Sequence, residues 1–144
     1  MKTKYKYGFT CGAYDLLHYG HVLILKECKR QCDYLIVGLQ VSPHLDPGYR
    51  DKVKNKPIQT LEERLEVLKA IKYVDEIHIY SRESDLLKLL KKLRRENRLD
   101  VQFWGNDWKG KHPTGWNLGQ VNVYHDRTRH RWSSTFMRRL MGYE

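Results

Sequence analysis

The sequence has few of the features that mark secreted or membrane proteins. It contains only three cysteines, Cys11, Cys28 and Cys32, and these cannot all pair within one chain. Cys28 and Cys32 lie one helical turn apart, which is a poor spacing for a disulfide. No apolar run approaches the length of a membrane span, and the N-terminal residues contain no hydrophobic signal region. We therefore expect free thiols in a reducing cytoplasm and no membrane span.

A metal site is also poorly supplied with ligands. A site built from Cys28, Cys32 and a histidine would need a second ligand pair nearby, and the sequence offers none. Small, buried, apolar cysteines are the favoured interpretation.

Acidic residues are scarce relative to basic ones. The chain has 17 Asp and Glu residues against 27 Lys and Arg residues, for a formal net charge of +10. Such a charge suits a polyanionic partner, and nucleic acid, an anionic membrane and a nucleoside triphosphate all qualify. At 144 residues, with 40% hydrophobic residues, the chain can form one compact domain over residues 1–144.

Strands and helices are predicted to alternate along the chain. Apolar and β-branched runs predict strands over residues 5–11, 34–39, 74–80, 100–105 and 120–125. Helical spacing and caps predict helices over residues 21–32, 60–72, 84–98 and 133–141. This alternation predicts an α/β fold, a single-domain, Rossmann-like open sheet that is mostly parallel with helices on both faces. Residues 42–58 lack an apolar period and predict a long mobile loop, which in a compact domain is usually functional.

A phosphate site is predicted where the first strand gives way to the first helix. Ligands of open α/β sheets bind at the carboxyl ends of strands, and a helix N-terminus offers unpaired N–H groups. His18 and His21 are three residues apart, so both imidazoles can donate to phosphate oxygens, while Gly20 lets the backbone approach a ligand closely. A pair of histidines at this spacing is also common on surfaces and in cores, and zinc would need further ligands that the sequence lacks.

The whole segment 12–21 favours a phosphate site over a purely structural pair of histidines. Its sequence is Gly-Ala-Tyr-Asp-Leu-Leu-His-Tyr-Gly-His. It resembles the signature of the cytidylyltransferase group of the HxGH nucleotidyltransferases, and most closely that of bacterial glycerol-3-phosphate cytidylyltransferases. Further segments similar to that family follow in the same order, at residues 52–57, 62–64, 73–76, 105–111, and 127–128 with 133–135.

The resemblance implies transfer of a cytidylyl group from CTP to a small phosphorylated alcohol, such as glycerol 3-phosphate, with release of pyrophosphate. His18 and His21 would hold the triphosphate and stabilise charge on the bridging oxygen during in-line displacement. Neither needs to act as a base, because the attacking group is already a phosphate anion. Lys54 or Lys56 would close over the phosphates. Mg²⁺ would accompany the triphosphate, held largely by phosphate oxygens.

The resemblance also implies a set of site residues. Those implied in catalysis are His18, His21, Lys54 and Arg127. Those implied in nucleotide binding are Gly12, Ala13, Tyr14, His18, Gly20, His21, Lys56, Gly105, Asp107, Trp108, Arg127, Thr128, Ser133, Ser134 and Thr135. Those implied in acceptor binding are Asp15, Arg64, Lys54 and Lys88. A homodimer is implied as well, with residues 73–76 near the dimer contact.

Several of these residues have a simpler interpretation. The lysines of the basic loop can be merely solvated, Trp108 can be a packing residue, and Ser134 can cap the last helix. The chain also departs from the family pattern. The spacer at residues 129–132 is one residue longer than usual and lacks its glycine, so contacts to the base can differ. Asn106 replaces a carboxylate, and only Lys88 remains for the acceptor-phosphate lysine.

Three other functions remain open. An adenylyltransferase using ATP on a phosphorylated metabolite carries the same histidine motif. A catalytically silent nucleotide binder would fit the altered spacer. The basic residues of 88–98 and 127–139 suit a nucleic-acid-binding module, although a charged outer helix face is usually only solvated, so nucleic acid is not the expected partner. A class I aminoacyl-tRNA synthetase is excluded, because the chain is far too short and lacks the lysine-serine loop.

Overall fold

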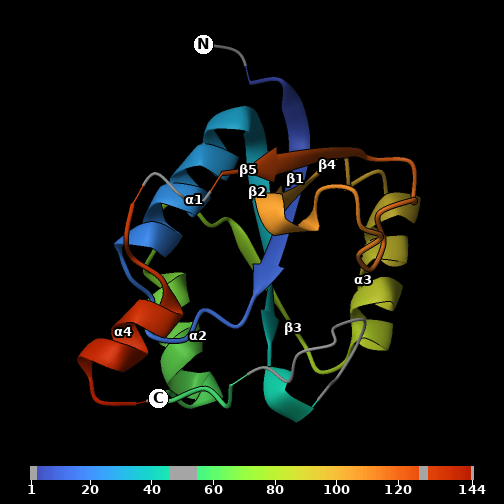
Figure 1. Cartoon of the computed structure of the whole chain (residues 1–144). Coiled ribbons are helices and arrows are strands. Elements are labelled where there is room, and N and C mark those ends of the chain that lie inside the picture. Colours follow the sequence, from blue (N-terminus) through green and yellow to red (C-terminus); the bar gives the residue numbers. More distant parts are fainter. Residues whose placement is uncertain (1–2, 46–54, 127–129, 144) are drawn as a thin grey trace.

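A computed structural model describes residues 3–45, 55–126 and 130–143 (Figure 1). At its centre lies a sheet of five strands in the order β3-β2-β1-β4-β5, and every neighbouring pair is parallel. The strands are β1 (Tyr5–Gly12), β2 (Cys32–Gln40), β3 (Glu76–Tyr80), β4 (Val101–Gly105) and β5 (Val121–His125). The predicted α/β class with an open parallel sheet is confirmed.

Helices connect the strands. They are α1 (Tyr19–Gln31), α2 (Leu61–Lys69), α3 (Glu83–Arg95) and α4 (Ser134–Leu140), with short 3₁₀ turns η1 (Pro43–Leu45) and η2 (Asn106–Trp108). The capping box predicted at Thr60 and Glu63 is present at the start of α2. α1 begins two residues before the predicted helix, because His18 acts as its N-cap.

The sheet is covered on both faces, as predicted. α1 and α2 lie over one face and α3 over the other (Figure 1). Leu35 and Val37 of β2 belong to the core cluster beneath α1 and α2, whereas Ile36 belongs to the cluster beneath α3. Side chains alternate between the faces of a strand, so β2 is apolar throughout because both of its faces are buried. Cys28 and Cys32 are buried in the first cluster and form no disulfide with a described residue.

The order of the strands determines where a ligand site is expected. The chain moves from β1 outward to β2 and β3, and then returns to the other side of β1 as β4. Gly8 and Phe9 pair with Val101 and Gln102, so β1 and β4 reach the carboxyl edge of the sheet together. Ligands of such sheets bind at this reversal point.

The long loop predicted at 42–58 is described in part. η1 occupies its beginning, and residues 46–54, including Lys54, lie outside the described residues. None of the described helices is both long and apolar enough to cross a bilayer.

Candidate active site

The chain leaves β1 through a strained turn. Tyr14 and Leu16 have φ angles of +50° and +51°, in the left-handed region that residues with a side chain rarely adopt. The Asp15 carboxylate, 8% exposed, accepts the N–H groups of Ile58 and Gln59 at 2.8 and 2.9 Å. These bonds hold the turn against the segment that leads into α2. Strain maintained by surrounding bonds is typical of functional sites.

His18 and His21 share the first turn of α1. His18 Nδ1 accepts the N–H of Gly20 at 3.0 Å, and His21 Nδ1 accepts the N–H of His18 at 3.2 Å. The centroids of the two rings are 4.0 Å apart. A neutral imidazole has one acceptor nitrogen and one N–H donor. Because the backbone occupies Nδ1 in both rings, each Nε2 carries the proton and is a donor.

The Nε2 donor of His18 is buried and makes no hydrogen bond to any described residue. Burial, followed by the proximity of His130, lowers the pKa of His18, so its ring is neutral near pH 7. A buried donor without an acceptor costs about 1–3 kcal/mol. A phosphate oxygen at this position would satisfy it.

Arg64 donates hydrogen bonds at the carboxyl edge of the sheet. Its side chain is 2% exposed, and burial lowers its pKa while the Asp15 carboxylate opposes this shift. The guanidinium donates to four backbone carbonyls, those of Ala13, Gln40, Val41 and Gln59. These bonds join the ends of β1 and β2 to the approach to α2. The geometry gives Arg64 a positioning role, and its contact with an acceptor stays a prediction.

Residues 130–133, which precede α4, lie across the start of α1. A Cβ placed on Gly20 would lie 2.4 Å from His130 Cε1 and 2.9 Å from the Trp132 carbonyl oxygen. Gly20 therefore lets this segment approach the backbone closely, and its contact with a ligand stays a prediction. We call residues 130–133 the strap. The hydroxyl of Ser134, just after it, donates to the Asp15 carbonyl at 3.3 Å.

α4 is capped by Ser133. Its hydroxyl accepts the N–H of Phe136 at 3.0 Å, so the capping role considered for Ser134 belongs to its neighbour. Thr135 is exposed and lines a cavity of about 370 Å³ together with Asn55, Arg138, Arg139 and Tyr143. The side chain of Lys56 is exposed, and its carbonyl accepts a hydrogen bond from Arg138.

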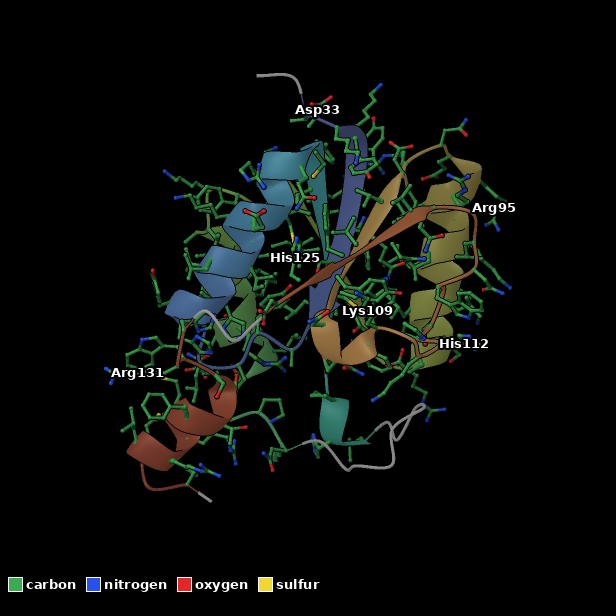
Figure 2. The ribbon with its side chains drawn as sticks, turned by 45° about the horizontal axis from the view of Figure 1, so that its top comes forward. Asp33, Arg95, Lys109, His112, His125 and Arg131 are labelled. Atoms are coloured by element: carbon green, nitrogen blue, oxygen red, sulfur yellow. The ribbon has the colours of Figure 1, made fainter. Side chains whose placement is uncertain are left out.

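The remaining predicted nucleotide contacts follow β1 and β4. Gly12 and Gly105 end these strands, and Ala13 follows Gly12. Asp107 is exposed in η2, while Trp108 is partly exposed with its ring centroid 6.3 Å from that of Trp104. Figure 2 shows Lys109 near the end of β4 and Arg131 near the start of α4.

Two predicted residues are placed differently. Tyr14 is only 7% exposed and packs in the core beneath α1, with its ring 5.5 Å from that of His21. Little of its side chain is therefore available to a nucleotide. Lys88 is exposed on α3, across the sheet from α1, so the structure does not bring it to the histidines. Arg127 and Thr128, like Lys54, lie outside the described residues.

Two contributors were not predicted from the sequence. The side-chain oxygen of Gln59 accepts the N–H of the strained Leu16 at 2.8 Å. His130 approaches His18 from a segment more than a hundred residues away in the sequence. Its only sequence signal was the unusual spacer. Among the described residues, no group of three or more His, Cys, Asp or Glu side chains could hold a metal ion.

Known proteins resemble this chain in sequence and in fold. The glycerol-3-phosphate cytidylyltransferase of Bacillus subtilis (strain 168) is 29% identical over 106 residues, covering 71% of this chain and 72% of that protein. The bifunctional protein HldE of Rhodopseudomonas palustris (strain BisB5) is 40% identical over 86 residues, covering 60% of this chain. This match spans only 17% of the length of HldE.

The fold is shared with a solved structure. The lipopolysaccharide core biosynthesis protein from Thermoplasma volcanium GSS1 superposes with a TM-score of 0.60 at 22% identity, over 88% of this chain and 98% of that one. This likeness supports the fold alone. The model of the cytidylyltransferase-like family matches residues 9–135, from β1 to the start of α4. The chain therefore belongs to the cytidylyltransferase-like family of nucleotidyltransferase enzymes.

Proposed function

We propose that the chain transfers a cytidylyl group from MgCTP to a small phosphorylated alcohol, forming a CDP-linked product and releasing pyrophosphate. The observation that carries this proposal is the pair of Nε2–H donors at the start of α1, of which the His18 donor is buried and without a partner among the described residues. Glycerol 3-phosphate is the leading acceptor, supported by the similarity to the cytidylyltransferase of B. subtilis.

The reaction needs charge stabilisation rather than a base. An oxygen of the acceptor phosphate attacks the α-phosphorus of CTP, and the bond from that phosphorus to the bridging oxygen breaks. Pyrophosphate leaves with the electron pair. The Nε2–H groups of His18 and His21 donate to the oxygens on which negative charge increases, and the N-terminus of α1 adds a partial positive charge. Mg²⁺ enters as part of the nucleotide substrate, held by phosphate oxygens.

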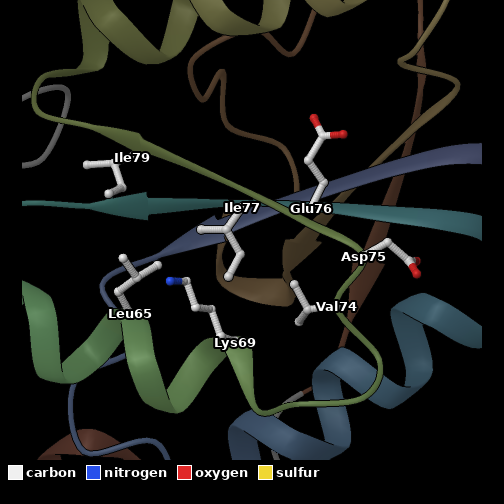
Figure 3. Close-up of a pocket in the computed structure, with 7 residues that line it drawn as sticks. All are labelled: Leu65, Lys69, Val74, Asp75, Glu76, Ile77 and Ile79. Atoms are coloured by element: carbon white, nitrogen blue, oxygen red, sulfur yellow. The ribbon is translucent and has the colours of Figure 1, made fainter.

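A homodimer through the β3 edge of the sheet is part of the proposal. β3 ends the sheet on this side, with Ile79 49% exposed, and Val67 on the adjacent α2 is 38% exposed. A cavity of about 360 Å³ lies here, lined by Leu65, Lys69, Val74, Asp75, Glu76, Ile77 and Ile79 (Figure 3). A second copy would cover this apolar surface and the unpaired strand edge. Sedimentation should give a dimer for the wild type and a monomer for Ile79→Lys.

Pyrophosphate release tests the reaction. The wild-type protein is assayed with each of the four ribonucleoside triphosphates and Mg²⁺, against a panel of phosphorylated alcohols. We expect release with CTP and one acceptor. Release with ATP alone would indicate an adenylyltransferase. CTP binding without turnover on any acceptor would indicate a catalytically silent nucleotide binder. A protein that binds no triphosphate would overturn the proposal.

A further inference from the structure

The strap brings a third histidine to the start of α1. The Cε1 atoms of His130 and His18 lie 2.4 and 2.9 Å from the position that a Cβ on Gly20 would occupy. Both imidazoles therefore approach the same point at the N-terminus of the helix. The His130 side chain is half-buried, with its ring centroid 6.2 Å from that of Tyr19 in an edge-to-face arrangement.

His130 repeats the hydrogen bonding of the other two histidines. Its Nδ1 accepts the N–H of Trp132 at 3.1 Å. The neutral ring must then carry its proton on Nε2. In His18, His21 and His130 alike, a backbone N–H occupies Nδ1 and leaves Nε2–H as the donor. Three side chains from two distant segments thus present the same donor at one helix terminus.

The surroundings of this cluster favour an anion. Next to burial, the proximity of His130 lowers the pKa of His18, which favours the neutral ring with its Nε2–H donor. Among the described residues of α1, the first turn contains no acidic side chain that would repel an anion. A bound polyanion would accept from several Nε2–H groups together.

We propose that His130 is a third phosphate-binding residue, whose Nε2–H donates to the β- or γ-phosphate of the bound nucleoside triphosphate. This inference rests on the proposed function. His130 belongs to the spacer at residues 129–132, which is one residue longer than in the resembling family and lacks its glycine. Its contribution should depend on the number of phosphates on the nucleotide.

A matched variant separates this role from a structural one. In His130→Asn the side-chain oxygen of asparagine can still accept the N–H of Trp132, as asparagine commonly does in turns. The variant has no group that replaces the Nε2–H donor of His130. His112→Asn is the control, because His112 is an exposed histidine stacked on Trp116 in the loop beside α3. The affinities of the full chain for CTP and for CMP are measured by calorimetry with Mg²⁺ present.

We expect His130→Asn to weaken CTP binding about tenfold, which is typical of losing one charge-assisted hydrogen bond. CMP binding, the melting temperature and the behaviour of His112→Asn should match the wild type. Equal weakening of CTP and CMP, or CTP binding as tight as in the wild type, would overturn the assignment of His130 alone. A wild-type protein that binds no triphosphate would overturn the proposed function, and this inference with it.

Discussion

His18 performs two tasks with one ring. Its Nδ1 caps α1 by accepting the N–H of Gly20, and its Nε2 is left as a buried donor. Serine, threonine and aspartate are the usual N-caps, but their side chains would be used up by the cap. Histidine has a second nitrogen on the far side of the ring. The same residue therefore provides both the N-cap of α1 and the buried Nε2–H donor.

The cysteines should differ in reactivity because they differ in burial. Burial raises the pKa of Cys32 to about 11, against the opposing effect of Lys29, and the thiol is 1% exposed. Since the thiolate is the reactive form, Cys32 should resist a thiol reagent at pH 8 until the protein unfolds. Partly exposed Cys11 should react first. Labelling is followed by absorbance with and without denaturant. Fast native labelling that persists in Cys11→Ser would contradict this expectation.

At the scale of elements, α1, the strap and the approach to α2 converge on the carboxyl ends of β1 and β4. The strap reaches α1 over Gly20, and Asp15 ties the turn to Ile58 and Gln59. None of these links is local in sequence. The site is therefore assembled only when the sheet has formed.

Gly20→Ala tests the contact between α1 and the strap. The new Cβ would meet His130 at 2.4 Å, and the His18 ring and the Trp132 carbonyl oxygen at 2.9 Å each, so the strap and the His18 ring must move. The helix itself should gain, since alanine is favoured over glycine by about 1 kcal/mol in a helix. We expect the KM for CTP to rise about tenfold while the protein remains folded. Steady-state kinetics and thermal melting check this, with exposed Lys26→Ala as the α1 control. Kinetics like those of the wild type would refute the contact.

The elements themselves were largely predictable. β2 was located by its continuous apolar run, because it is buried on both faces. The other four strands were located by apolar, aromatic and β-branched residues. The start of α1 was missed by two residues, since histidine is an unusual cap. The position of the histidine pair between the first strand and the first helix was predictable, and its role as a phosphate site stays a prediction. Arg64 was predicted to bind the acceptor, but its hydrogen bonds to the ends of β1 and β2 could not be foreseen, and His130 was not predicted at all, because both depend on contacts distant in sequence.

At the scale of the whole molecule, Glu76 links β2, β3 and the segment after α3. Its carboxylate accepts from Tyr34 at 2.8 Å and Arg98 at 2.6 Å, and it also contacts His78. Burial alone would raise its pKa. The hydrogen bonds from these three partners outweigh burial and lower the pKa to about 2, from an ordinary 4.5. Glu76, at the start of β3, thus stabilises the fold at the end of the sheet opposite the carboxyl ends of the strands.

This linkage predicts acid sensitivity with a definite sign. A carboxylate whose pKa is depressed by folding stabilises the protein above its unfolded pKa. That stabilisation, on the order of 2 kcal/mol after solvent screening, should be lost as the pH falls from about 4.5 to 2. Urea unfolding at a series of pH values should show a shallower decline in this range for Glu76→Gln. The same decline in both proteins would contradict the assignment.

In the proposed reaction, the His18 Nε2–H group stabilises charge on the transferring triphosphate. His18→Asn removes this donor and preserves the start of α1, because asparagine is a good N-cap. The measurement is the rate of pyrophosphate release from saturating CTP and acceptor, beside the melting temperature. We predict a fall in kcat of about 100-fold or more at nearly unchanged stability, as for loss of one transition-state donor. A variant that turns over at the wild-type rate would contradict the claim.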